Sequence, residues 1–211
     1  NLKVMALLDA ACRIAGVVQA ETLWPTIRDL SVAILPAERA VVTNLFQRVL
    51  RPRRVVKNLG EPDAGPFQRT IGYREYVQLQ GSFCLGLGCA RNRLPEWLGD
   101  LVLNVNYLGK RGSLMQIRAL PTYVDELLPD FVELTAEPAS FDVRGTLQVL
   151  DDCTSALTFA KANIYDTGSK IRLGKERITR NVVLPYRLAR STRSYSMYER
   201  VAPVSDPGGL V

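Results

Sequence analysis

One stretch of the chain constrains its fold more than any other, because a helix pattern, a turn and a strand pattern follow one another in it without a break. The stretch is LPEWLGDLVLNVNYLGKRGSLMQI, residues 94–117. Pro95 suits the first turn of a helix, and the apolar residues after it recur at helical spacing. Gly109 lies where a C-cap glycine belongs, and residues 114–117 begin a short apolar run. The stretch predicts a helix, a basic turn and a strand.

The chain before this stretch contains further elements. Residues 2–18 place their apolar side chains on one helix face, and Gly16 lies near the end of that pattern. Trp24-Pro25 indicates a break, and residues 30–35 form a short apolar run typical of a buried strand. Residues 39–50 fit a strand or a helix by periodicity, although the Val-Val-Thr triplet near their start favours an extended chain.

The clearest strand pattern is the alternation of residues 70–79, after which Gly81-Ser82 offers a turn and residues 83–87 a return strand. Downstream, residues 141–150 fit a strand or a short hairpin, and residues 153–165 fit a helix. The last forty residues lack a strong core period. We therefore expect a less regular C-terminal region.

Composition excludes several classes of protein. The 211 residues are 47% hydrophobic, which is enough to bury a core, but no run of eighteen apolar residues indicates a membrane span or a secretory signal. We expect a soluble, cytoplasmic protein. Four scattered cysteines form no CxxC pair and the chain has no histidine, so we expect neither a metal site nor a cofactor. Without imidazole, hydrolases with a histidine-containing triad are excluded, and so are nucleases that use histidine as acid or base.

Charge is unevenly distributed along the chain. The net charge is +6, and residues 170–200 hold nine Lys and Arg against Glu176 and Glu199, whereas the rest of the chain has 18 against 19. A basic C-terminal region indicates a polyanionic partner, or an arginine-rich surface that keeps the protein in solution. Residues 121–142 hold six acids and no base, and we interpret them as a solvated acidic connector.

Residues 48–57 form the densest cationic segment, with five basic residues, no acid, and a Gly- and Pro-rich stretch directly after them. This composition predicts a protruding basic loop or hairpin, which either contacts RNA or another protein or is simply solvated. A single RNA strand is held by cations on its phosphates and by aromatic surfaces against its bases. Arg74 and Tyr76 share one side of the predicted strand and could supply both.

Three runs in the chain resemble the Cas-five family of CRISPR-associated RAMP proteins. They are ILPAERAVVTNLFQR, YREYVQLQGSF and LPEWLGDLVLNVNYLGKRGSL. The resemblance covers about residues 1–120, which we expect to form a ferredoxin-like RAMP domain, with residues 121–211 as a C-terminal extension. The expected fold class is α+β, a ferredoxin-like (βαββαβ, RRM-like) domain with a basic hairpin insertion. The first strand of that pattern would precede Asn1.

The resemblance implies a noncatalytic subunit of a type I CRISPR surveillance complex, or Cascade. Such a subunit holds the 5′ handle of the guide RNA and contacts the backbone and large subunits during recognition of target DNA, which the basic C-terminal region could also touch. In the family a hairpin of this kind acts as a thumb over the RNA. We expect nine RNA-binding residues: Arg48, Arg51, Arg53, Arg54, Lys57, Arg74, Tyr76, Lys110 and Arg111.

Two alternatives stay open. One branch of the family processes guide-RNA precursor with Tyr, Lys and His. Here Tyr73 or Tyr76 with Lys57 or Lys110 would have to act without histidine. The third interpretation is a basic scaffold subunit that contacts no base.

Overall fold

The computed structural model describes residues 2–89, 94–109, 112–135, 145–163 and 170–201. They form two compact units built from discontinuous segments: unit 1 takes in the described parts of 1–36 and 83–184, and unit 2 those of 37–82 and 185–202. The fold is mixed α and β with mostly antiparallel pairing, compatible with the predicted α+β class. The division expected at residue 120 stays a prediction. In the part of the chain that is described, no helix has the length and apolar character needed to cross a membrane.

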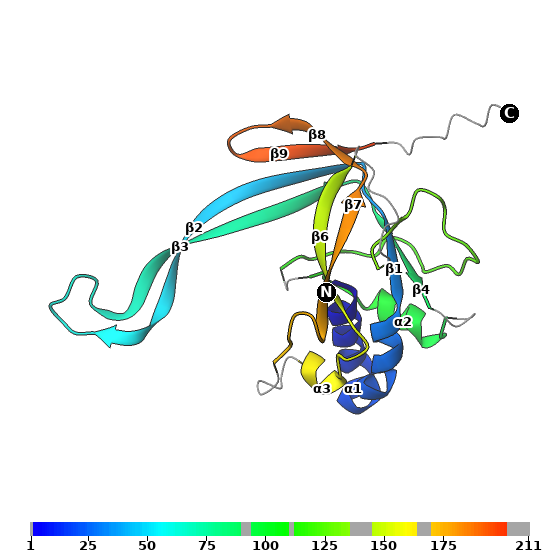
Figure 1. The fold of residues 1–211 in the computed structure, drawn as a ribbon, viewed down its shortest axis with the longest axis horizontal. Coiled ribbons are helices and arrows are strands. Elements are labelled where there is room, and N and C mark those ends of the chain that lie inside the picture. Colours follow the sequence, from blue (N-terminus) through cyan, green and yellow to red (C-terminus); the bar gives the residue numbers. More distant parts are fainter. Residues whose placement is uncertain (1, 90–93, 110–111, 136–144, 164–169, 202–211) are drawn as a thin grey trace. The chain divides into compact units, whose positions relative to one another are not determined.

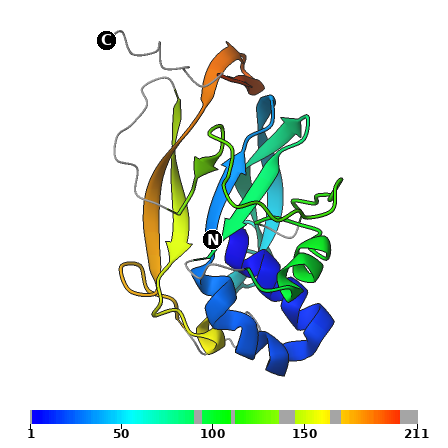
Figure 2. The ribbon, with the colours of Figure 1, turned by 90° about the vertical axis from the view of Figure 1, so that its right-hand side faces the viewer.

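Unit 1 begins with helix α1, Leu2–Asp29, which changes direction at Gly16 (Figure 2). Gly16 has φ 79° and ψ 165°, a conformation that is closed to other residues, so two helical segments meet there. The break predicted at Trp24-Pro25 is wrong, because Pro25 lies inside the second segment. Burial explains why the helix continues: Trp24 is 3% exposed and Ile27 fully buried.

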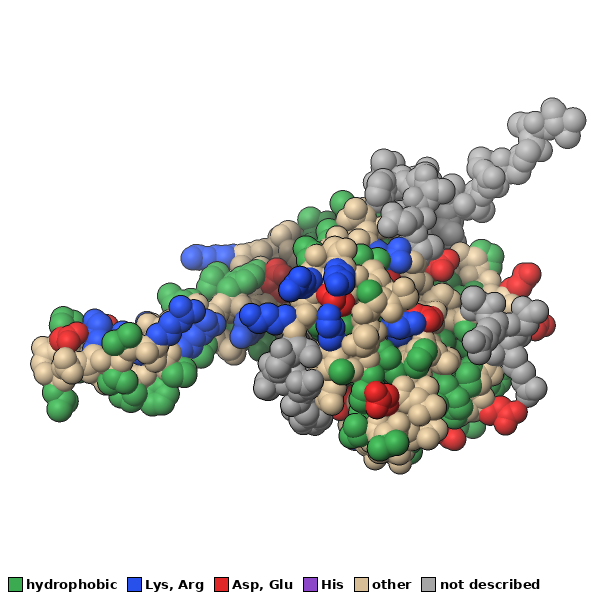
Figure 3. Space-filling model, turned by 60° about the horizontal axis from the view of Figure 1, so that its bottom comes forward, with side chains coloured by type: hydrophobic (Ala, Val, Ile, Leu, Met, Phe, Trp, Pro, Cys, Tyr) green, Lys and Arg blue, Asp and Glu red, His purple; other side chains and the backbone are tan. Residues whose placement is uncertain are grey.

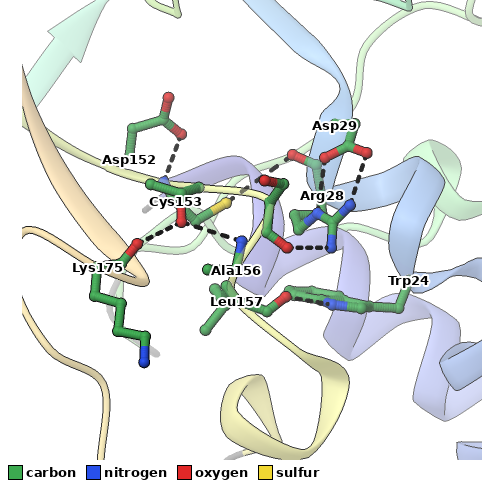
Figure 4. Close-up of polar contacts among 10 residues, drawn as sticks. Trp24, Arg28, Asp29, Asp152, Cys153, Ala156, Leu157 and Lys175 are labelled. Atoms are coloured by element: carbon green, nitrogen blue, oxygen red, sulfur yellow. Dashed lines mark hydrogen bonds and ion pairs between the residues drawn. The ribbon is translucent and has the colours of Figure 1, made fainter.

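A polar network connects α1 to the segment that leads into the short helix α3, Phe159–Ala162 (Figure 4). Trp24 Nε1 donates to the carbonyl of Leu157 at 2.9 Å, and Arg28 Nη1 donates to the carbonyl of Ser155 at 2.8 Å. The rings of Trp24 and Phe159 meet edge to face, with centroids 6.4 Å apart. These contacts explain why the second half of α1 is held against residues more than a hundred positions away.

Three strands of unit 1 form a sheet in the order β4-β1-β5, with β1 spanning Ser31–Leu35, β4 Cys84–Gly88 and β5 Val132–Glu133. Strands β6, Thr146–Cys153, and β7, Arg177–Leu184, form a separate antiparallel pair. Helix α2 covers Trp97–Leu103. The buried core of the unit joins the three helices to Leu30 and is made by Leu7, Leu8, Ala11, Ala20, Trp24, Ile27, Leu30, Leu98, Leu101, Leu157, Phe159 and Ala162.

Two strand predictions in unit 1 need correction. Residues 83–87 were expected to return along 70–79, but β4 pairs antiparallel with β1 instead. No strand follows α2 at residues 114–117, where a single bridge joins Tyr107 and Leu114. Leu114 is 82% exposed, so the first residue of the expected strand buries little apolar surface here.

Unit 2 is a four-stranded antiparallel sheet in the order β3-β2-β9-β8 (Figure 1). Strands β2, Arg39–Lys57, and β3, Gly65–Gln80, form a long hairpin, so the ambiguous residues 39–50 are extended and the basic segment 48–57 lies on its distal half. Strand β9, Tyr195–Arg200, pairs with only the first five residues of β2, and β8, Tyr186–Ser191, pairs with β9.

The C-terminal region is more regular than its sequence suggests, because β7, β8 and β9 fill most of residues 177–200. Arginines occupy many positions in these strands. The alternation of apolar and polar residues on which strand prediction depends is therefore not visible in the sequence. The expected strand at 141–150 corresponds to β6, although residues 136–144 lie outside the described part. The helix expected at 153–165 is reduced to α3, and residues 164–169 are also outside it.

We predict that Gly16→Ala lowers the free energy of unfolding by about 1–3 kcal/mol, because alanine is strained in this conformation. Denaturant unfolding followed by circular dichroism measures the change. Gly99→Ala inside α2 is the matched control, since a Cβ there meets only the Tyr123 hydroxyl at 4.0 Å, and we expect it to be neutral or stabilising. Equal destabilisation by both variants would contradict the assignment of a special backbone role to Gly16.

Candidate nucleic-acid interface

The register of unit 2 gives its sheet two chemically different faces, because directly paired residues on neighbouring strands share a face. Thr43 pairs with Tyr76 on β3 and with Tyr195 on β9. Arg74 and Arg51 follow at two-residue steps on the same side of the hairpin. We call this side the basic face and define it by Arg39, Arg51, Arg74, Tyr76, Arg187, Arg190 and Tyr195.

The basic face combines exposed guanidinium groups with two tyrosine rings. Arg51, Arg74 and Arg187 are exposed, and the guanidinium carbon of Arg190 lies 5.9 Å from the centroid of the Tyr195 ring. One acid, Glu199, lies on this face and pairs with Arg39 at 3.3 Å. Lys and Arg side chains are spaced along the hairpin in Figure 3. The face therefore carries both positive charge and aromatic surface.

The opposite side of the hairpin, which we call the apolar face, is unusually rich in exposed hydrophobic side chains. Phe46 is 70% exposed and packs against Tyr73 with ring centroids 5.1 Å apart. The apolar face is defined by Phe46, Leu50, Phe67, Ile71, Tyr73 and Val77. Arg48, which pairs with Ile71, and Arg69, which pairs with Leu50, also lie on this side and not with Arg51.

Tyr73 is held by two acceptors on the apolar face. Its hydroxyl lies 2.7 Å from Asn44 Oδ1 and 2.9 Å from Glu75 Oε1, and it can donate to either. Partial desolvation and the hydrogen bond to the Glu75 carboxylate raise the pKa of Tyr73. The phenol therefore stays protonated at neutral pH.

Two of the predicted RNA-binding cations shape the tip of the hairpin. Arg53 donates to the carbonyls of Phe67 at 3.1 Å and Asp63 at 2.9 Å, and Lys57 donates to the carbonyl of Pro62 at 3.2 Å. Strand register shifts between Pro52 and Lys57, so a bulge separates this tip from the regular ladder. These contacts give both cations a structural role, whatever else they bind.

The structure thus places Arg51, Arg74 and Tyr76 on one side of the hairpin and Arg48 on the other. Arg74 is two residues from Tyr76, whereas Arg51 pairs with Gln68, eight residues along β3 from Tyr76. Arg54 is exposed within the bulge at the tip. Lys110 and Arg111 lie outside the described residues. Sequence reasoning did not connect Arg187, Arg190 or Tyr195 to the hairpin, because β9 pairs with β2 across more than 150 positions.

The basic residues of the C-terminal region are divided between the two units. In unit 1, Arg177 binds both carboxylate oxygens of Asp151 at 2.8 Å, and Arg180 binds Asp152 at 2.7 Å across the β6–β7 pair. These two cations are neutralised locally, whereas Arg187 and Arg190 belong to unit 2. Of the described residues, no three or more His, Cys, Asp and Glu are grouped so that they could hold a metal ion.

A buried ion pair anchors the start of β7 to α3. Glu176 is 1% exposed, accepts a hydrogen bond from Lys161 Nζ, and accepts another from the backbone N–H of Arg172 at 2.9 Å. The bond from Lys161, followed by that from Arg172, lowers the pKa of Glu176 to about 2. The carboxylate is therefore favoured in the folded protein.

No family model matches the chain. A CRISPR-associated protein Cas5 from Archaeoglobus fulgidus is 27% identical to it over 118 residues, which are 55% of this chain and 48% of that protein. The matched stretch thus spans about half the length of the relative. The similarity supports a relationship to CRISPR-associated Cas5 proteins, which the three sequence runs predicted.

We predict that stability falls as pH decreases from about 4.5 towards 2, because Glu176 binds its proton more readily in the unfolded chain. Glu176→Gln should lower the melting temperature at pH 7 and flatten this part of the pH profile. Exposed Glu61→Gln is the control and should melt like the unaltered protein at pH 7. If the melting temperature of Glu176→Gln falls with pH as steeply as that of the unaltered protein, the ion pair does not contribute to the pH dependence of stability.

Proposed function

We propose that the chain is a noncatalytic subunit of a type I CRISPR surveillance complex that holds the 5′ handle of the guide RNA on the basic face of unit 2. The similarity to a CRISPR-associated Cas5 protein supports the setting. The proposal includes a ferredoxin-like arrangement for unit 1, with the β2–β3 hairpin inserted between β1 and β4.

The observation that carries this proposal is the clustering of arginine and tyrosine on one face of one sheet. Phosphates of a single strand are held by cations, and its bases stack on aromatic rings. Arg74 and Tyr76 are two residues apart on β3, and Arg190 and Tyr195 face the same side from β8 and β9. A strand of RNA lying on this face can reach both kinds of group.

The proposal also includes protein partners, and the exposed hydrophobic side chains of the apolar face are the evidence for them. Ile71 is 73% exposed and Phe46 70%, which is costly for a ribbon surrounded only by water. We propose that the backbone and large subunits of the complex cover this side, while RNA occupies the other. Contact of the basic C-terminal region with target DNA stays a proposal for Arg187 and Arg190.

The endoribonuclease and the scaffold remain the alternatives, and neither has a specific observation in its favour. A tyrosine that acts as a general base works best with a lowered pKa, whereas that of Tyr73 is raised. Tyr73 and Tyr76 also lie on opposite faces of the sheet, so they cannot act on one phosphodiester together.

We predict that Arg51→Gln with Arg74→Gln weakens binding of a fluorescein-labelled single-stranded RNA and lowers the slope of log affinity against log salt by about 1.4, or about 0.7 per lost phosphate contact. Fluorescence anisotropy across a salt series measures both. Arg48→Gln on the opposite face is the matched control and should leave the slope unchanged. An equal effect of Arg48→Gln would place RNA on both faces, and no effect from any variant would refute the proposed interface.

We also predict that the purified protein leaves CRISPR repeat RNA intact with or without Mg²⁺. Denaturing gel electrophoresis of end-labelled RNA detects any product. Site-specific cleavage that Tyr73→Phe or Tyr76→Phe abolishes would overturn the noncatalytic assignment and establish the endoribonuclease in its place.

A further inference from the structure

We propose that Tyr76, Thr43 and Tyr195 form a slot on the basic face that takes one unstacked nucleobase of a single-stranded RNA. The inference rests on the proposed function and adds a defined subsite to it. The slot is made by three adjacent strands, with Thr43 on the central strand β2 and one tyrosine on each side.

The geometry of the sheet gives the slot its width. Neighbouring strands lie about 4.8 Å apart, so the backbones of Tyr76 and Tyr195 are separated by roughly 10 Å. A planar base between two rings needs roughly 7 Å, twice the 3.4 Å spacing of stacked bases. Because the side chain between the rings is only a threonine, the space above β2 is left for a flat ligand.

The groups that line the slot are already arranged. Thr43 Oγ1 lies 3.4 Å from the carbonyl of Tyr76, so the threonine side chain can donate within the sheet. Arg190 on β8 approaches the ring of Tyr195 from the side away from β2. In this strand order, Arg190 leaves the side of Tyr195 that faces β2 to the proposed slot. Tyr76 is 53% exposed and Tyr195 half-buried, so the rings are accessible yet supported.

The neighbours of the slot suit a nucleotide rather than an isolated aromatic ligand. Arg74 lies two residues from Tyr76 on the same face, where its guanidinium can bind a flanking phosphate. Gln78 lies two residues away in the other direction and offers an amide to a base edge. Since every base has a flat π surface, stacking gives affinity with little sequence preference.

The first test compares variants that lose the two tyrosine rings with variants that keep them. We expect Tyr76→Ala with Tyr195→Ala to reduce affinity for a single-stranded RNA by about 5- to 150-fold while the salt slope stays unchanged. Tyr76→Phe with Tyr195→Phe should bind like the unaltered protein, because the rings and not the hydroxyls stack. Tyr73→Ala on the apolar face is the matched control.

A second readout follows the base itself. An RNA with one 2-aminopurine should lose fluorescence when its base enters the slot, and the Tyr→Ala pair should restore that fluorescence. An abasic RNA of equal length should bind the unaltered protein and the Tyr→Ala pair equally. Should the tyrosine variants unfold, Thr43→Phe provides an independent arm, because a ring at this exposed position fills the slot and should also weaken binding.

The outcomes separate the slot from the proposed function. If the arginine variants weaken binding but the tyrosine variants and the abasic RNA do not, RNA binds through phosphates alone and the slot is refuted. If neither set of variants changes affinity, the basic face does not bind RNA and the proposed function fails with it. Loss of affinity in the Tyr→Ala pair with retained affinity in the Tyr→Phe pair supports the slot.

Discussion

The pairing of β9 with the first five residues of β2 is the constraint on which unit 2 depends. It joins a hairpin from the middle of the chain to two strands near its C-terminal end. The hydroxyl of buried Tyr186 donates to the carbonyl of Ala37 at 2.7 Å, and Arg39 pairs with Glu199, so the junction is tied by side chains as well as by the ladder. Without this pairing, Arg190 and Tyr195 would have no fixed relation to Tyr76.

Because the ladder places alternate residues on opposite sides, the hairpin presents two chemically different surfaces. One side presents arginines and tyrosine rings, and the other presents mostly apolar side chains together with Arg48 and Arg69. A substitution therefore alters one surface or the other according to its position, and the basic face takes odd-numbered residues of β2 but even-numbered residues of β3. Arg48 and Arg51 are three residues apart, and they illustrate this division.

The sequence predicted those helices and strands whose apolar or charged residues recur at regular spacing within one segment. The alternation of residues 70–79 became β3, the apolar face of residues 2–18 became the first part of α1, and the basic segment became part of a hairpin. Long-range pairing left no such signal, so β4 was given the wrong neighbour and β8 and β9 were missed. At Pro25 the local signal was present but wrong. Proline predicts the end of a helix, yet the helix continues because the burial of Trp24 and Ile27 outweighs that preference.

Beyond Thr43 the hairpin has no third strand in register, and this freedom has a geometric consequence. Two-stranded ribbons coil more strongly than wider sheets, and the hairpin turns along its length in Figure 1. Arg51 and Tyr76 belong to one face of the ladder, but the twist of the ribbon between them turns that face along the hairpin. An RNA strand that contacted both residues would have to follow this twist around the ribbon. The twist of the hairpin would then set how many nucleotides separate the two contacts.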